Sequence, residues 1–247
     1  MSKSTSLSTI LYLRQRLHGL KIYETSDLMQ HINTFDELVS EQVAASLRFP
    51  SERWLEVITK EPRAFVYHNF LTNEECEHLI SLAKPSMARS KVRNAITGLG
   101  EESSSRTSSG TFLRRGHDKI VKEIEKRISE FTFIPEENGE ALQVIHYEVG
   151  QKFEPHFDGL QRIATVLMYL SDVDKGGETV FPEAKGIKSK KGVSVRPKKG
   201  DALLFWSMRP DGSQDPSSKH GGSPVIKGTK WASSKWFRFH KFTNTIW

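Results

Sequence analysis

The alternation of hydrophobic and polar positions divides the chain into a weakly patterned start and a strongly patterned remainder. Residues 1–60 show a loose amphipathic spacing that fits one or two short helices and no compact fold of their own. The apolar positions of that spacing are Leu28, Ile32, Phe35, Leu38 and Val43. We therefore expect a lead-in over residues 1–60 and one folded domain over residues 61–247.

The first part of this domain predicts a strand followed by a helix. Residues 64–70 are rich in aromatic and β-branched side chains, as strands are. Thr72 and Glu75 have the spacing of a capping box, in which each side chain bonds the other residue's backbone N–H. The predicted helix ends before Pro85, and its apolar face consists of Cys76, Leu79, Ile80 and Ala83.

A loop and a second helix are predicted next. The loop is the Gly- and Ser-rich segment 97–110, and the helix spans residues 117–131. The apolar stripe of this helix is Ile120, Ile124 and Ile128, with Val121 beside it. Its opposite, polar face carries Lys122, Glu123, Glu125 and Lys126.

After Pro135 the pattern changes to short strands separated by turns. The predicted strands are residues 142–147, 164–170, 179–181, 193–196, 202–206 and 231–239. The predicted turns are Gly176-Gly177, residues 199–201, residues 210–212 and Gly221-Gly222. Helices followed by many short strands indicate an α+β protein that closes on a β-sandwich or jelly roll.

Composition narrows the possible classes of protein. The chain has 247 residues, and 36% apolar with 10% aromatic content is enough for a β-rich core. A net charge of +6 without a binding motif does not indicate a nucleic-acid partner. The single cysteine, Cys76, excludes an intramolecular disulfide and a thiolate zinc site, and we expect it to be a small buried hydrophobe. No stretch is apolar enough to span a membrane, and the first 20 residues lack a secretory signal pattern.

The strongest candidate chemistry is a possible metal triad of His156, Asp158 and His220. Two imidazoles and one carboxylate hold iron(II) on one face and leave positions open for substrate and oxygen. Residues two apart on a strand point to the same side, so His156 and Asp158 are placed to meet one ion. The alternative for this pair alone is a histidine hydrogen-bonded to a neighbouring carboxylate.

A lysine follows the second histidine of this triad at Lys230. Alternation along the predicted strand puts five side chains on one face, namely Lys230, Ala232, Ser234, Trp236 and Arg238. If that face lines a barrel, the ammonium is buried and needs an anionic partner such as a dicarboxylate. The alternative is a lysine at a strand start in solvent.

The surrounding motifs resemble one enzyme family over about residues 61–239. They include EPRAFVYHNFLTNEECEHLISLAKP, SRTSSGTFLRRG, LQVIHYEVGQKFEPHFD, GGETVFP and GTKWASSKWF. These segments are similar to plant-type prolyl 4-hydroxylases of the iron- and 2-oxoglutarate-dependent dioxygenase superfamily. The resemblance implies a double-stranded β-helix (jelly-roll) core buttressed by N-terminal helices.

The resemblance also implies roles for individual residues. His156, Asp158 and His220 would bind iron(II), and Lys230 would pair with the distal carboxylate of 2-oxoglutarate. Tyr147 and Thr179 fall where the family adds hydrogen bonds to that carboxylate. The expected peptide-binding residues are Arg162, Glu140, Trp236, Arg106 and Arg238, the last at a position where the family often has histidine.

The implied activity is 4-hydroxylation of peptidyl proline, with iron(II), 2-oxoglutarate, O2 and L-ascorbate as cofactors and co-substrates. A proline-rich polypeptide substrate would arrive preorganised as polyproline II. Two alternatives remain: a 2-oxoglutarate oxygenase with another substrate, and a catalytically silent module that binds proline-rich chains. We expect a monomer. The resemblance implies a location facing the endoplasmic reticulum lumen, with a cytosolic location as the alternative.

Two connections are shorter here than in the family. Residues 159–161 alone separate Asp158 from Arg162, where the family has a long loop that covers substrate. The segment 183–192 is also short and lacks the cysteine that the family pairs with one after the HGG turn. Phe153 stands where a tyrosine is common. We therefore expect retained iron and 2-oxoglutarate binding, with weaker or altered peptide turnover.

Overall fold

The computed structural model describes residues 30, 33–35, 37, 54–93, 99–159, 161–185 and 192–243 of the chain. Within the first 53 residues, the described positions 30, 33–35 and 37 are helical. Of the apolar positions predicted to form helices there, Phe35 is described. The others, Leu28, Ile32, Leu38 and Val43, lie outside the described residues.

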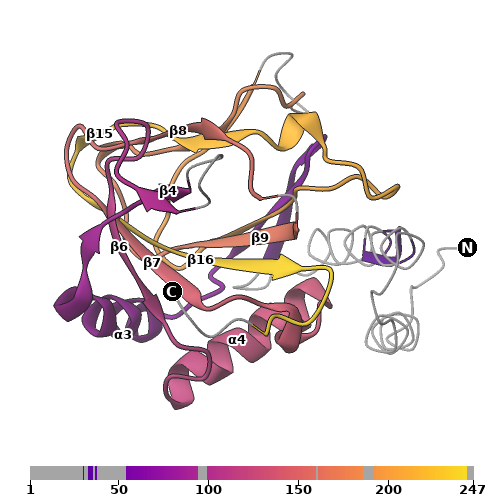
Figure 1. Ribbon diagram of the computed structural model, residues 1–247, viewed down its shortest axis with the longest axis horizontal. Helices are drawn as coiled ribbons and strands as arrows, with labels where there is room; N and C mark the ends of the chain where they lie inside the picture. The colour runs from indigo at the N-terminus through magenta and orange to yellow at the C-terminus, as the bar shows by residue number, and fades with distance from the viewer. Residues whose placement is uncertain are drawn as a thin grey trace, which may run out of the picture.

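The centre of the molecule is a sheet of eight antiparallel strands (Figure 1). In spatial order they are β1 (Trp54–Lys60), β2 (Arg63–His68), β13 (Ala202–Trp206), β9 (Arg162–Tyr169), β16 (Lys230–Arg238), β7 (Leu142–Tyr147), β6 (Ser109–Leu113) and β3 (Ala88–Arg89). The predicted strands 142–147 and 202–206 therefore have the bounds that the sequence indicates. The strand predicted at 231–239 begins and ends one residue earlier.

A second, four-stranded sheet lies against one face of the first (Figure 1). Its strands are β12 (Val193–Val195), β11 (Thr179–Phe181), β14 (His220–Gly222) and β8 (Phe153–His156). Two short pairs flank it: β4 (Val92–Arg93) with β5 (Gly100–Glu101), and β10 (Lys175–Gly176) with β15 (Val225–Lys227). The predicted turns at Gly221-Gly222 and Gly176-Gly177 are thus wrong in part, because Gly221, Gly222 and Gly176 belong to strands.

Close backbone packing explains why glycines occupy these strand positions. An ideal Cβ at Gly221 would lie 2.8 Å from the Phe153 carbonyl oxygen of β8, and one at Gly176 would lie 2.3 Å from the Pro224 oxygen. A glycine inside a strand marks such a close approach of two backbones as well as it marks a turn. Close strand packing thus explains Gly221, whereas Gly176 also has a φ of +79°, a conformation that glycine adopts without strain.

Two helices, α3 (Asn73–Ala83) and α4 (Lys119–Thr132), cover the other face of the large sheet (Figure 1). The predicted capping box of α3 is confirmed: the Thr72 hydroxyl accepts from the Glu75 N–H at 3.2 Å, and the Glu75 carboxylate accepts from the Thr72 N–H at 2.9 Å. Cys76 is fully buried on this helix, as predicted, and burial raises the pKa of its thiol to about 11.

The predicted faces of α4 are corrected by the structure. Ile120 is 39% exposed, whereas Val121 is fully buried and takes its place in the stripe with Ile124 and Ile128. Glu125, predicted on the polar face, is 6% exposed and accepts a 2.6 Å hydrogen bond from Lys235 of β16. The buried face is thus rotated toward Glu125, because a cation on the sheet beneath it balances the buried carboxylate.

The predicted domain boundary at residue 61 falls inside the β1–β2 hairpin. Trp54 pairs with His68 and Lys60 with Arg63, so the folded domain begins at least seven residues earlier than expected. Phe35 is 1% exposed and packs edge-on against Phe65 and Trp206 of the large sheet. The sequence could not reveal this, because strand pairing and core contacts join residues that are distant along the chain.

The core has two layers, one on each side of the large sheet. Along β13, Ala202, Leu204 and Trp206 pack toward the helices. The alternate residues Leu203 and Phe205 pack in the cluster between the two sheets. Both faces of β13 are therefore buried, which explains its continuous apolar run.

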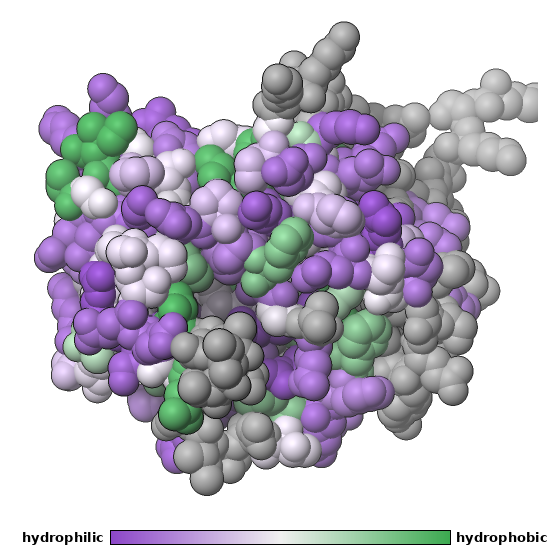
Figure 2. Space-filling model, turned by 45° about the horizontal axis from the view of Figure 1, so that its top comes forward, coloured by the Kyte–Doolittle hydropathy of each residue, from purple (hydrophilic) through white to green (hydrophobic). Residues whose placement is uncertain are grey.

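The molecular face in Figure 2 is mainly hydrophilic, with hydrophobic residues in small separate groups.

Candidate active site

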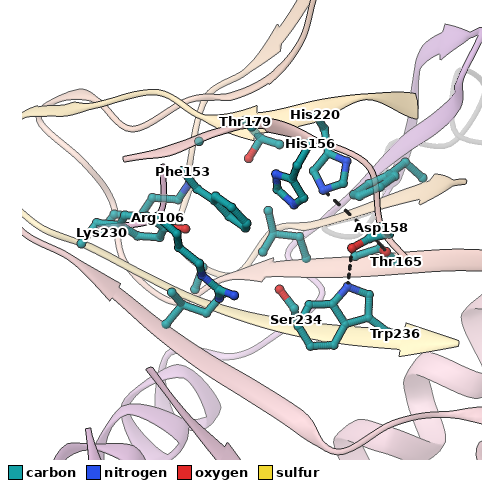
Figure 3. A pocket seen from close by; sticks show the side chains of 17 residues that line it. Arg106, Phe153, His156, Asp158, Thr165, Thr179, His220, Lys230, Ser234 and Trp236 are labelled. Carbon is teal, nitrogen blue, oxygen red and sulfur yellow. Dashed lines mark hydrogen bonds and ion pairs between the residues drawn. The ribbon is translucent and has the colours of Figure 1, made fainter. Parts of the chain in front are cut away.

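The three predicted metal ligands converge at one end of the space between the two sheets (Figure 3). His156 ends β8 and His220 begins β14, and the two residues are cross-strand partners. Asp158 follows two residues after β8, so it lies beyond the strand on which alternation was expected to place it. One donor atom of each residue lies within 4.8 Å of the other two.

Backbone carbonyls hold both histidine rings in one orientation. Nδ1 of His156 bonds the Glu154 carbonyl at 2.9 Å, and Nδ1 of His220 bonds the Ser218 carbonyl at 2.9 Å. A neutral imidazole bonded in this way donates from Nδ1 and keeps the lone pair of Nε2 for a metal ion. The alternative for the pair, a histidine bonded to its neighbouring carboxylate, does not describe His156, whose Nδ1 partner is a carbonyl.

The protonation states of the triad also fit a divalent cation. Burial, with the adjacent His220, lowers the pKa of His156 to about 4. Burial alone would raise the pKa of the Asp158 carboxyl, but His220, Arg162 and the Thr165 hydroxyl outweigh it and lower that pKa. Metal ligands must be deprotonated, and neutral imidazole with carboxylate is the donor set of iron(II) oxygenases. These three residues therefore fit iron(II).

Lys230 is buried in the pocket that contains the triad. The pocket encloses about 540 Å³, open solvent at its mouth included, and is also lined by Tyr147 and Thr179. Lys230 is 3% exposed, and its Nζ donates to the Gly177 carbonyl at 2.7 Å. Burial lowers the pKa of this ammonium to about 8. The solvent alternative for Lys230 is thus wrong, and a buried ammonium favours an anionic partner.

Strand alternation along β16 brings most of the predicted face to this pocket. Lys230, Ala232, Ser234 and Trp236 all line it, as expected. Arg238, the fifth member, does not line the pocket. It donates to Glu140 at 2.8 Å and to Gln161 at 2.7 Å, where β16 shifts register against β9.

The five predicted peptide-binding residues fall into two groups. Arg106 and Trp236 line the pocket. Arg162, Glu140 and Arg238 form an ion-pair cluster behind Trp236. Arg162 makes two 2.9 Å hydrogen bonds to the buried Glu140 carboxylate, and its guanidinium lies 3.8 Å from the centroid of the Trp236 ring. Glu140 is therefore placed to orient two arginines, whereas direct contact with a peptide stays a prediction for all five.

Arg106 reaches the pocket from the loop before β6. Its guanidinium lies 4.7 Å from the centroid of the Phe153 ring and donates to Gln143 at 3.0 Å.

The short connection after Asp158 is closed by a hydrogen bond from the Arg162 N–H to the Gly159 carbonyl at 2.8 Å. That bond joins the two described ends of the connection at the edge of the site.

Sequence reasoning missed one polar residue of the pocket, Thr165 of β9. It is 3% exposed and donates to the Asp158 carboxylate at 2.6 Å. Its signal was one threonine in a largely apolar strand. Because threonine is common in strands, that signal alone does not point to a site.

Comparison with known proteins agrees with this geometry. The sequence profile of the 2OG-Fe(II) oxygenase superfamily matches residues 142–238, which include all three ligands and Lys230. Probable prolyl 4-hydroxylase 11 of Arabidopsis thaliana is 79% identical over 262 residues, covering 90% of this chain and 96% of that protein. Prolyl 4-hydroxylase 5 of the same plant is 66% identical over 213 residues, covering 77% of this chain and 73% of that protein.

Among solved structures, a viral collagen prolyl hydroxylase of Paramecium bursaria Chlorella virus-1, in a complex with 2OG, matches with a TM-score of 0.55. It is 26% identical and covers 76% of this chain and 97% of that chain. This similarity identifies the two-sheet core as a double-stranded β-helix buttressed by helices, as predicted.

The alignments contain gaps in this chain. The match to prolyl 4-hydroxylase 5 runs over 213 positions but takes in 77% of 247 residues, about 190, so about 23 positions of that relative have no counterpart here. This chain is therefore shorter than that relative within the matched region. With nearly its whole length aligned at 79% identity to one relative, the chain belongs to the plant-type prolyl 4-hydroxylases of the 2OG-Fe(II) oxygenase superfamily.

Proposed function

We propose that this protein hydroxylates C4 of prolyl residues in proline-rich polypeptides. Peptidyl proline, 2-oxoglutarate and O2 give 4-hydroxyproline, succinate and CO2. The observation that carries the proposal is the single pocket that joins the His156, Asp158 and His220 triad to the buried ammonium of Lys230. The prolyl 4-hydroxylase names of the relatives support the choice of substrate.

The triad would hold iron(II). When bound, this ion would activate oxygen in a reaction coupled to the decarboxylation of 2-oxoglutarate. Lys230 would pair with the distal carboxylate of 2-oxoglutarate and so set how deeply the co-substrate enters. The Tyr169 hydroxyl donates to Thr179 at 2.9 Å, which leaves the Thr179 hydroxyl proton for that same carboxylate. Apolar lining residues such as Ile145, Leu167 and Phe205 exclude water from the reacting atoms.

On the substrate side, the Trp236 ring and the Arg106 guanidinium form walls of the pocket. Arg162 covers Trp236, and Glu140 keeps that arginine in place. A flat indole held in this way offers an apolar surface on which a prolyl ring can pack. A proline-rich chain would also bind with little loss of conformational entropy, because it is preorganised. With three residues between Asp158 and Arg162, the connection is too short to cover this side as a long loop would.

We further propose L-ascorbate as an auxiliary reductant and a location facing the endoplasmic reticulum lumen, both from the family resemblance. We also propose a monomeric state. No helix in the described part of the chain has the length and apolar character needed to cross a membrane.

A proline-rich peptide incubated with the protein, iron(II), ascorbate and 2-oxoglutarate tests the proposal. We expect mass spectrometry to show the gain of one oxygen atom on proline, together with peptide-dependent succinate release. His156→Ala should abolish both by removing a metal ligand. His117→Ala, an exposed histidine before α4, is the matched control and should retain both.

The other outcomes separate the alternatives. Succinate release that the peptide does not stimulate would indicate an oxygenase with another substrate. Peptide binding that survives His156→Ala, with no succinate release from the wild-type protein, would indicate a silent binding module. Either result would contradict the proposed activity. A slow but peptide-dependent reaction would agree with it, since the connection after Asp158 is short.

A further inference from the structure

The Asp158 carboxylate lacks the local support that the other two ligands have. His156 and His220 lie on strands, and each ring is held by a carbonyl two residues earlier in the chain. Asp158 lies in the connection between β8 and β9, outside any strand. Its orientation must therefore come from side chains elsewhere in the fold.

Two donors from neighbouring strands supply that support. The Thr165 hydroxyl donates to Oδ2 of Asp158 at 2.6 Å, and the Trp236 indole N–H donates to Oδ1 at 3.1 Å. Thr165 of β9 and Trp236 of β16 are direct cross-strand partners. One rung of the large sheet thus presents one donor to each oxygen of a single carboxylate (Figure 3).

The two oxygens are not equivalent. Oδ2 is the oxygen that faces the other ligands, since it lies 3.9 Å from Nε2 of His220. Oδ1 faces Trp236, with the Arg162 guanidinium 3.6 Å away. The Thr165 hydroxyl therefore bonds the oxygen on the metal side. It occupies one lone pair of Oδ2 and leaves the other lone pair available for a metal ion bound by the three ligands.

From this geometry we propose that Thr165 is a positioning residue that fixes the Asp158 carboxylate for the metal ion. The inference rests on the proposed function, because it assumes that the triad binds a divalent cation. Thr165 is 3% exposed, so water does not compete for its hydroxyl group. Its hydrogen bond to Asp158 is therefore stronger than the same bond would be in water. Partners of this kind orient metal ligands, and their loss typically costs about 10- to 100-fold in metal affinity.

Titration of the metal-free protein with Mn²⁺ alone, followed by calorimetry, tests the role without any turnover. We expect Thr165→Val to weaken Mn²⁺ binding by about 10- to 100-fold. Thr165→Ser, which keeps the hydroxyl, should restore most of the affinity, whereas Thr165→Ala should bind as weakly as Thr165→Val. The Ser and Ala variants both lose the methyl group, so their difference isolates the hydrogen bond.

Thr132→Val is the matched control. Thr132 is fully buried in α4 and donates to the Ile128 carbonyl at 2.9 Å, away from the pocket. Its replacement should leave Mn²⁺ affinity unchanged. If Thr165→Val binds Mn²⁺ as tightly as wild type, or if Thr165→Ser binds no better than Thr165→Ala, the positioning role is overturned while the proposed function stands. If the wild-type protein binds no Mn²⁺, both are overturned.

Discussion

At the scale of single residues, Lys230 has the environment that most restricts the chemistry of the pocket. Its Nζ lies 5.4 Å from the centroid of the Tyr147 ring and 5.6 Å from that of Tyr169. Aromatic faces attract a cation only weakly. Among the described residues, the one hydrogen-bond acceptor of the Lys230 ammonium is the Gly177 carbonyl. The pKa of about 8 follows from this burial. A dicarboxylate that enters the pocket would restore the charged form.

This environment predicts that 2-oxoglutarate binds more weakly as the pH rises through the pKa of Lys230. Above pH 8 the free protein holds Lys230 neutral, so binding the anion requires uptake of a proton. With a pKa of about 8, we expect the dissociation constant to rise about tenfold from pH 7 to pH 9. Calorimetric titration with 2-oxoglutarate at saturating Mn²⁺ measures it.

Two variants check the assignment to Lys230. Lys230→Arg should weaken binding but remove most of the pH dependence, because arginine stays protonated. Lys227→Arg changes a lysine whose side chain is 75% exposed and should keep the wild-type profile. A Lys230→Arg protein with the same pH slope as wild type would show that another group titrates.

At the scale of elements, β16 joins the pocket to the helical layer. Its alternate residues face opposite ways: Trp236 lines the pocket, while Lys235 and Phe237 are buried on the side of the helices. Lys235 pairs with Glu125 of α4, and the same carboxylate accepts from the Gly116 N–H at 2.7 Å. A single buried ion pair thus links the helix to the strand that carries Lys230 and Trp236.

We expect Glu125→Ala to lower the free energy of unfolding by about 3 to 5 kcal/mol, because it leaves the Lys235 ammonium buried without its counter-charge. The double replacement Glu125→Leu with Lys235→Met should cost much less, since it removes both charges. Urea denaturation measures both. Glu123→Ala, on the exposed face of α4, should change stability by no more than about 0.5 kcal/mol. Equal losses for Glu125→Ala and the double variant would contradict the pairing.

At the scale of the whole molecule, the part of the chain before the predicted boundary takes part in the fold. Phe35 also packs against Phe131 and Phe133, whose ring centroids each lie 6.3 Å away. Its side chain therefore bridges the end of α4 and the large sheet. The β1–β2 hairpin extends that sheet at its edge, next to β13.

Phe35→Ala should consequently lower the free energy of unfolding by about 3 to 5 kcal/mol, the usual cost of removing a buried aromatic ring. The matched control is Phe112→Ala, because Phe112 is 36% exposed on β6 and should cost clearly less. Urea denaturation of the full chain compares the two. Equal losses would mean that Phe35 does not belong to the cooperative core.

Some of this protein follows from local patterns in the sequence. The bounds of β7, β11 and β13, the capping box at Thr72 and the pocket-facing residues of β16 depend on side-chain periodicity and on contacts a few residues apart. The spacing of His156 and Asp158 pointed to the metal site, although Asp158 lies beyond the end of β8 and not on the strand as alternation predicted. The roles of Lys230, Tyr147 and Thr179 came from resemblance, and the structure places all three in one pocket.

What only the tertiary structure decided involves partners distant along the chain. The burial of Glu125 depends on Lys235, which is 110 residues away, and the placement of Phe35 depends on Trp206. The support of Asp158 by Thr165 and Trp236 depends on the register between β9 and β16. A sequence determines which residues are able to bind a metal or form a strand. Their neighbours in space are set by strand pairing and packing, because these bring together charges and hydroxyl groups that no local pattern relates.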